Sequence, residues 1–251
     1  IYGYRDTSKE YSGDITITYD GGKVGKIYGV YGTYSKRATV KGDVGIYMES
    51  GTMTDTYSAV YGSFYGIADN VTVEVNGGTY RYTEFYGSYL SEIPGDVNFE
   101  VNGAPVFKCG SRGGSYATML CAVYSSKVAG DVNIYLAVSD TSCGFTENMA
   151  YSYFYGVYDT EVAGNVNCES DGHWWPGYNY VVYESTIEKN VDVDILSGRF
   201  YSSSIDSVLV KDSTVNGTVD FDVAANATNL YLYNLYMLGG KTTVKNLQAT
   251  I

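Results

Sequence analysis

The residue types best suited to ligand binding gather in three segments near the middle of the chain. Two segments are intervals between recurring apolar motifs, and they measure 26 and 22 residues where the other intervals measure 12 to 17. The third segment, 171–177, contains the one histidine and both tryptophans of the chain. Function in repeat proteins concentrates in such loops. The predicted ligand-binding cluster is Lys108, Arg112, Tyr116, Asp140, Glu147, His173, Trp174 and Trp175.

The two tryptophans of this cluster are neighbours in the sequence. Trp174 and Trp175 cannot both face the core of an extended strand. One interpretation is a hydrophobic lid over the long insertions. The other is a patch that stacks on sugar rings or contacts a partner protein. The sequence leaves both interpretations open.

Catalysis would need groups that this cluster supplies only in part. A polysaccharide lyase needs a basic residue to abstract a proton and usually Ca²⁺, and Lys108 and Arg112 are the available bases. A glycoside hydrolase needs a carboxylate pair, for which Asp140 and Glu147 are the candidates. His173 has no identifiable nucleophile. No catalytic residue is predicted, and an enzyme of either kind is the alternative hypothesis.

A column of Asp and Asn residues suggests a second kind of chemistry. Corner residues of this type hydrogen-bond backbone amides, which predicts a ladder of turns. The alternative is a row of Ca²⁺ sites, because oxygen ligands suit that ion and stacked carboxylates repel one another. The spacing does not match the known calcium-binding nonapeptides, so no cofactor is predicted. The weak calcium candidates are Asp14, Asp43, Asp96 and Asp131.

Two further rows lie on predicted strands. An acidic row, from Glu74 to Asp222, is expected on a solvated sheet face. A tyrosine row is expected to stabilise neighbouring strands, with a flat platform for sugar rings or a partner as its functional alternative. Its members are Tyr2, Tyr28, Tyr61, Tyr86, Tyr124, Tyr155 and Tyr183.

The four cysteines form no Cys-x-x-Cys pair, so a structural zinc site is not predicted. Cys109 and Cys143 lie at similar positions in the two long insertions, which makes a disulfide plausible outside the cell. Cys168 occupies an apolar column and is expected to be a buried thiol. Cys121 is expected to pack inward.

An internal repeat positions all of these residues. A motif of apolar–x–Gly–Asp/Asn–Val–x–apolar type recurs eight times, at steps of 25 to 35 residues, and apolar and polar residues alternate around each anchor. The anchors are Ile15, Val44, Val71, Val97, Val132, Val166, Val191 and Val219. This pattern predicts an all-β, single-domain, right-handed parallel β-helix (a β-solenoid) that spans residues 1–251 in about eight coils.

Composition limits the possible partners. The chain has 16 basic and 28 acidic residues, a net charge of 16 − 28 = −12, which disfavours nucleic acid as a ligand. No run of 18 apolar residues is present, so no membrane insertion is predicted. Because the chain starts within a coil, we expect it to be a segment of a larger protein. Open coil ends favour end-to-end or lateral self-association.

The repeats, such as 95–103 followed by a Val–Tyr–Gly element, resemble the adhesin-like repeat regions of large bacterial surface proteins, with gut anaerobes as a plausible source. At the level of fold they resemble the pectate-lyase-like superfamily. The resemblance implies a cell-surface or extracellular location. Together with the residues above, it predicts a non-catalytic interaction protein that binds glycans or another surface protein. A structural spacer or fibre subunit is a further alternative.

Overall fold

The computed structural model describes residues 1–55, 57–103, 105–108, 118–137, 153–172, 178–197, 199–200, 207–225, 227, 231–232 and 235–251. Within these residues every regular element is a β-strand and no helix is present. The two large sheets are built from parallel strands. The chain is therefore an all-β protein, as the sequence predicts.

The nine-stranded sheet has one strand from each repeat. Its strands pair in the order in which they occur along the chain, so each strand lies between its equivalents in the preceding and following repeats. They are β1 (Tyr2–Tyr4), β4 (Lys26–Tyr31), β8 (Ser58–Phe64), β12 (Thr83–Tyr89), β16 (Met119–Tyr124), β19 (Tyr153–Tyr158), β22 (Tyr178–Tyr183), β26 (Ser207–Lys211) and β29 (Leu235–Gly239).

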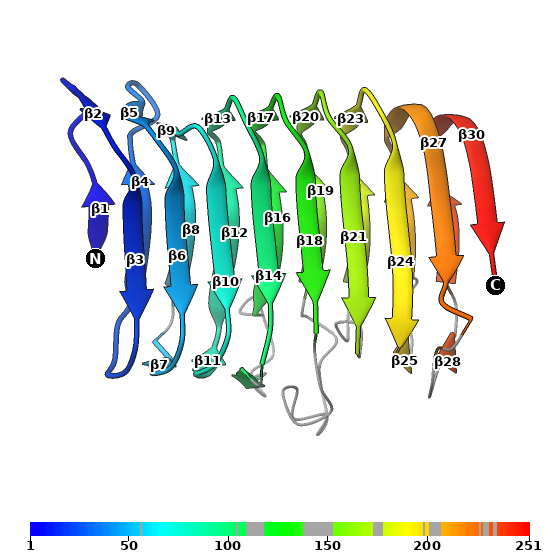
Figure 1. The fold of residues 1–251 in the computed structure, drawn as a ribbon, viewed down its shortest axis with the longest axis horizontal. Helices are drawn as coiled ribbons and strands as arrows, with labels where there is room; N and C mark the ends of the chain where they lie inside the picture. Colours follow the sequence, from blue (N-terminus) through cyan, green and yellow to red (C-terminus); the bar gives the residue numbers. More distant parts are fainter. Residues whose placement is uncertain are drawn as a thin grey trace.

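The sixteen-stranded sheet contains a long and a short strand from most repeats, and Figure 1 shows its long strands side by side with the chain termini at opposite ends. The long strands are β3 (Ile15–Tyr19), β6 (Val44–Met48), β10 (Val71–Val75), β14 (Val97–Val101), β18 (Val132–Leu136), β21 (Val166–Asp171), β24 (Val191–Ser197), β27 (Thr214–Val223) and β30 (Thr243–Thr250). The short ones are β2 (Glu10–Ser12), β5 (Ala38–Lys41), β9 (Gly66–Ile67), β13 (Glu92–Ile93), β17 (Lys127–Val128), β20 (Glu161–Val162) and β23 (Thr186–Ile187).

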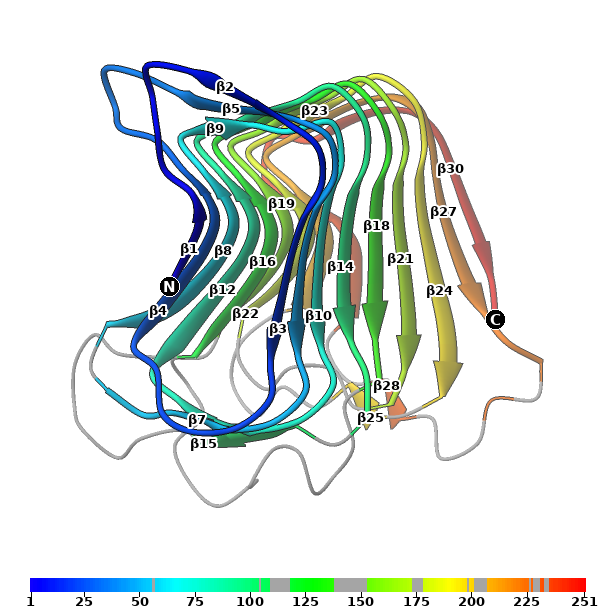
Figure 2. The same cartoon turned by 60° about the vertical axis from the view of Figure 1, so that its left-hand side comes forward.

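Two small sheets complete the described strands. One is formed by β7 (Thr52–Met53), β11 (Thr79–Arg81) and β15 (Val106–Lys108), and the other by β25 (Arg199–Phe200) and β28 (Tyr231–Leu232). Along the chain, each repeat thus forms a long strand of the sixteen-stranded sheet, then a small-sheet strand or a loop, then a strand of the nine-stranded sheet, and then a short strand (Figure 2).

The predicted anchors align in the sixteen-stranded sheet. Val71 pairs with Val44 on one side and with Val97 on the other, and the same register continues to Val219. Leu247 pairs with Val219 and extends the column to a ninth repeat. In β10, β14 and β18 the side chains alternate between buried and half-buried, because residues two apart point to the same face. The alternation in the sequence is therefore the cause of the register.

One apolar column differs from its prediction at Ile67. Ile67 and Ile93 each stand four residues before an anchor, so the sequence predicts that they lie side by side. The structure instead pairs Ile67 with Glu92, on the outer side of the short strands. The neighbouring Ala68 is fully buried in the core instead. The turn in this repeat is shorter by one residue, and a shift of one residue moves a side chain to the opposite face of a strand.

The core lies between the two large sheets. Val44, Val71 and Val97 meet Ile27 and Val60 there, and all five are almost completely buried. The strands of the nine-stranded sheet bend in the middle, which Figure 2 shows for β4, β8 and β12. Strand pairing skips one residue at this bend, for example between the pairs Tyr28–Tyr61 and Val30–Ser63. As a result, residues three apart can point to the same face.

Candidate binding surface

Most of the predicted loop cluster lies outside the residues that the structure describes. This holds for Arg112, Tyr116, Asp140, Glu147, His173, Trp174 and Trp175, and also for Cys109 and Cys143. Lys108 is the last residue of β15, where it pairs with Arg81 of β11, and only its backbone is described. The binding cluster and the disulfide therefore stay predictions, and the candidate surface below is built from other residues.

The Asx column forms a hydrogen-bonded ladder across repeats. The Asp43 backbone amide donates to Asp14 Oδ1 at 2.9 Å, and the Asp131 amide donates to Asp96 Oδ1 at 2.7 Å. Asn70, Asn165 and Asn190 act in the same way for the repeats that follow them. The carboxylates thus serve as acceptors for backbone amides, which supports the turn ladder. No set of three or more His, Cys, Asp or Glu side chains among the described residues has the arrangement of a metal site.

The acidic row lies on the outer face of the sixteen-stranded sheet, as predicted. Asp192 pairs with Asp220 and Asp194 pairs with Asp222 on adjacent strands. Partial burial, followed by repulsion from the neighbouring carboxylates, raises the pKa of Asp192 and of Asp194. A shallow depression of about 220 Å³ on this face is lined by residues that include Glu100, Asn133, Asn167, Glu169 and Asp194.

Two further ladders were not predicted. Amide groups connect neighbouring strands where Asn133 Nδ2 donates to Asn98 Oδ1 at 2.9 Å and Asn167 Nδ2 donates to Asn133 Oδ1 at 2.8 Å. Buried hydroxyls connect the repeats at the inner side of a corner. Ser126 Oγ accepts the Ser91 backbone amide at 3.0 Å and donates to the Tyr124 carbonyl at 2.8 Å. The signal in the sequence is a Ser or Thr two residues before the apolar residue of the short strands β13, β17, β20 and β23, and at the equivalent position of β27; these residues are Ser91, Ser126, Thr160, Ser185 and Ser213.

Tyrosines form a first column on the outer face of the nine-stranded sheet. Tyr28 stacks on Tyr2 and on Tyr61, each with ring centroids 5.1 Å apart, and Tyr61 stacks on Tyr86 at 5.0 Å. Tyr28, Tyr61 and Tyr86 are buried. Burial and the adjacent phenols raise the pKa of Tyr28 to about 12, so the phenols are neutral at physiological pH. The structural role predicted for this part of the row is confirmed.

The predicted tyrosine row is wrong at two positions. Tyr124 pairs with Tyr89, and Cys121 occupies the position next to Tyr86. Likewise Tyr183 pairs with Tyr158, and Tyr180 pairs with Tyr155. The bend explains the error, because two residues three apart both point outward in these strands: Cys121 and Tyr124 in β16, and Tyr180 and Tyr183 in β22. Cys121 is buried within this outer aromatic cluster, whereas the sequence places it in the core. Cys168 is buried in the core as predicted.

A second aromatic column runs beside the first. Phe64 stacks on Tyr31 at 5.4 Å and on Tyr89 at 5.2 Å, and Tyr89 stacks on Tyr124 at 4.8 Å. The column continues through Tyr158 and Tyr183, and its members are half-buried. We call these two columns together the aromatic face; its half-buried column is Tyr31, Phe64, Tyr89, Tyr124, Tyr158 and Tyr183.

Stacking determines which part of each ring meets solvent. Tyr31, Phe64 and Tyr89 are parallel to their neighbours within 8°, so each ring covers the faces of the next. The exposed part of this column is therefore the ring edges, which does not fit a flat platform of ring faces. The parallel stacking is interrupted between Tyr124 and Tyr158, whose rings are perpendicular. Beyond this point the Tyr180 and Tyr183 rings are inclined by only 22° within one strand.

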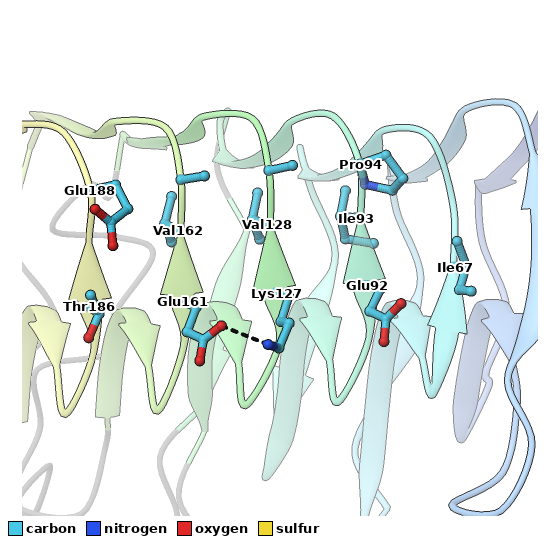
Figure 3. A pocket seen from close by; sticks show the side chains of 12 residues that line it. Ile67, Glu92, Ile93, Pro94, Lys127, Val128, Glu161, Val162, Thr186 and Glu188 are labelled. Carbon is cyan, nitrogen blue, oxygen red and sulfur yellow. Dashed lines mark ion pairs between the residues drawn. The ribbon is translucent and has the colours of Figure 1, made fainter.

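A groove of about 650 Å³ follows the outer side of the short strands (Figure 3). Its small floor residues include Pro94, Ala129 and Ala163. The charged groups at its edge already have partners. Lys127 Nζ lies 2.8 Å from Glu161, and Arg37 lies 3.2 Å from Glu92. Glu188 accepts a hydrogen bond from Asn216 at 2.9 Å. Because these charged groups are already paired within the protein, the groove is a weaker candidate for a ligand-binding site than the aromatic face.

The chain matches no protein-family model, no curated protein and no solved structure. The described residues contain no helix that is long and apolar enough to cross a membrane. The geometry of the described residues therefore supports the functional proposal.

Proposed function

We propose that this chain is a right-handed parallel β-helix that serves as a non-catalytic binding scaffold for linear glycans. The repeat-by-repeat parallel pairing supports the β-helix, with one strand of every repeat in each large sheet. The near-universal handedness of crossovers between parallel strands supports the right-handed winding. The adhesin-like character of the repeats and the acidic net charge support a location at the cell surface or outside the cell.

The observation that carries the binding function is the half-buried aromatic column. Aromatic side chains cover the outside of β4, β8, β12, β16, β19 and β22. The outer face of the sixteen-stranded sheet carries polar side chains instead, such as Asn98, Glu100 and Asn133, so the fold does not require aromatic groups on an outer face. A long row of partly exposed aromatic groups is typical of an interaction site. The row follows the length of the molecule, which suits a linear polymer.

The chemistry of the ring edges favours a glycan. Aromatic edges carry partial positive charge, and phenol hydroxyls both donate and accept hydrogen bonds. Sugar chains present many oxygen atoms that can meet both kinds of group. The acidic row lies on a regular sheet face, in the large sheet opposite the aromatic face. This setting favours binding over glycoside hydrolysis.

Binding of linear oligosaccharides to the full chain tests this proposal. Calorimetry with β-1,4-linked glucose, N-acetylglucosamine and glucosamine hexamers should detect at least one ligand. The double variant Tyr89→Ala/Tyr124→Ala should weaken that binding about thirtyfold, because each truncation removes a contact worth about 1 kcal/mol. Tyr135→Ala is the matched control, since Tyr135 is a half-buried strand tyrosine on the opposite sheet. Absence of binding to all three hexamers would contradict the proposal.

A further inference from the structure

The aromatic face already holds one ammonium group. Lys211 of β26 follows Tyr183 in the half-buried column, and its Nζ lies 5.4 Å from the centre of that ring. The same Nζ lies 5.2 Å from the centre of the Tyr180 ring. A cation within about 6 Å of a tyrosine ring is attracted by the electron-rich ring face. This end of the aromatic face therefore has the electrostatics to accept a cation.

Carboxylates line the same end of the face. Asp159, Glu184 and Asp212 directly follow β19, β22 and β26, each in the left-handed backbone conformation with φ of 48° to 51°. Asp159 and Glu184 are exposed. The equivalent position in three earlier repeats carries no charge, since it is occupied by Tyr65, Leu90 and Ser125. The row of carboxylates thus begins at Asp159, next to Tyr158, where the parallel stacking of the aromatic rings is interrupted.

Glu184 acts electrostatically on the tyrosines next to it. Burial raises the pKa of Tyr158 and of Tyr183, for Tyr183 to about 12, and the adjacent Glu184 carboxylate raises both further. Neutral phenol hydroxyls carry lone pairs that can accept a hydrogen bond from an ammonium group. One carboxylate and two phenols therefore form an acceptor-rich point beside the ring faces.

The surrounding charge favours a cationic ligand. β19 and β22 contain no lysine or arginine, and the whole chain carries a net charge of −12. The carboxylates recur once per repeat, at the spacing of adjacent parallel strands, about 4.8 Å. A polymer with one amine on every sugar ring repeats its charge at a similar spacing. A lysine-rich peptide would supply the charge but not the rigid rings that match an aromatic row.

We infer that the β19–β26 end of the aromatic face binds an amino-sugar polymer through its ammonium groups, with Asp159 and Glu184 as counter-charges and Tyr158 and Tyr183 as ring contacts. This inference rests on the proposed glycan-binding function and names the class of glycan.

Calorimetry on the full chain with the β-1,4-linked glucosamine hexamer tests the inference, in a mildly acidic buffer that keeps the amines protonated. The N-acetylglucosamine hexamer, which lacks the charge, should bind at least tenfold more weakly. Glu184→Gln should weaken binding of the glucosamine hexamer about fivefold, in line with the loss of an exposed charge pair. Glu188→Gln removes one charge from the same repeat at the corner groove and should leave the affinity unchanged.

The variant Lys211→Met should instead raise the affinity for the glucosamine hexamer. Removal of the resident ammonium frees the rings of Tyr180 and Tyr183 for the ligand, so affinity for the glucosamine hexamer should rise about threefold. Equal or tighter binding of the N-acetylated hexamer would overturn the inference and leave the proposed function intact. Hexalysine binding as tightly as the glucosamine hexamer would also overturn it, because charge alone would then explain recognition. Failure of every hexamer to bind would contradict the proposed function itself.

Discussion

At the residue scale, buried serine and threonine hydroxyls stabilise the fold through hydrogen bonds between repeats. Ser126 is buried, and its Oγ accepts from the Ser91 amide and from the Ser88 hydroxyl while it donates to the Tyr124 carbonyl. An unsatisfied buried polar group costs about 1–3 kcal/mol. The hydroxyl column therefore gives an acceptor to corner amides such as that of Ser91, and a second donor to carbonyls such as that of Tyr124, which also accepts from the Leu90 amide.

Ser126→Ala should lower the free energy of unfolding by about 2 kcal/mol, because it leaves the Ser91 amide and the buried Ser88 hydroxyl without this partner. Denaturant titration monitored by circular dichroism measures the change. Ser126→Thr is the matched control, since Thr160 occupies the same column in the next repeat and makes the same bond to a carbonyl at 2.8 Å. If the alanine variant were as stable as the threonine variant, the hydroxyl would have no stabilising role.

Asp194→Asn should stabilise the protein at neutral pH. The pKa of Asp194 is raised in the folded protein, chiefly by burial and then by Asp222, so ionisation destabilises the fold. Two carboxylates one strand apart repel by about 0.9 kcal/mol in water, and we expect a gain of about 0.5 kcal/mol for this exposed group.

The pH dependence of this effect has a definite sign. A raised pKa means that the destabilisation is absent below the unfolded value of about 3.9 and complete above the folded value. The difference in melting temperature between Asp194→Asn and the wild type should therefore be positive at pH 7 and vanish at strongly acidic pH. Asp69→Asn, which changes the net charge equally away from the carboxylate pairs, should show no such pattern.

At the scale of elements, the aromatic column couples neighbouring strands of the nine-stranded sheet. Tyr61 stacks on both Tyr28 and Tyr86 and contacts Phe64 edge-on at 4.9 Å. The rings thus replace solvent on a face that would otherwise be open. Part of the aromatic face is consequently structural, and only the half-buried column is available to a ligand.

Tyr61→Ala should destabilise the protein by about 3 kcal/mol, because it removes a buried aromatic ring and leaves a cavity between two stacked neighbours. Tyr61→Phe should cost much less, since Phe64 shows that the stack tolerates a ring without a hydroxyl. Thermal unfolding measures both variants. Tyr34→Ala, at a side chain that is 91% exposed, is the control and should have almost no effect.

At the scale of the whole molecule, stability is the sum of contacts between neighbouring repeats. The central strands β10, β14 and β18 have a repeat on each side, whereas β30 pairs with β27 on one side within the described residues. Most of the β30 side chains are exposed. Local stability should therefore fall from the centre of the molecule toward β30.

Hydrogen exchange measured by mass spectrometry should show this gradient. Amides of β14 and β18 should exchange slowest and those of β30 fastest, because exchange follows the free energy of local opening. The glucosamine hexamer, if it binds as inferred, should add protection at β19 and β22 rather than at β14. Uniform protection along the chain would contradict a stability built from neighbouring repeats.

The sequence by itself determined the register of the long strands in the sixteen-stranded sheet. Around Val71, Val97 and Val132 apolar residues alternate with polar ones, and one face of each strand must be buried, so a shift by one residue would expose the apolar set. The polar ladders follow from the same register. The carboxylate row and the Asx turn ladder could thus be placed by counting residues from each anchor.

Only the tertiary structure decided the register of the nine-stranded sheet. Leu120 and Val123 both point into the core because β16 bends between them, so local alternation does not reveal which one aligns with Phe85. Stacking against β12 selects Leu120, and this choice brings Tyr124 beside Tyr89. The half-buried aromatic column therefore arises from contacts between repeats, because ring stacking depends on neighbours about 30 residues away in sequence, which a pattern within one strand does not contain.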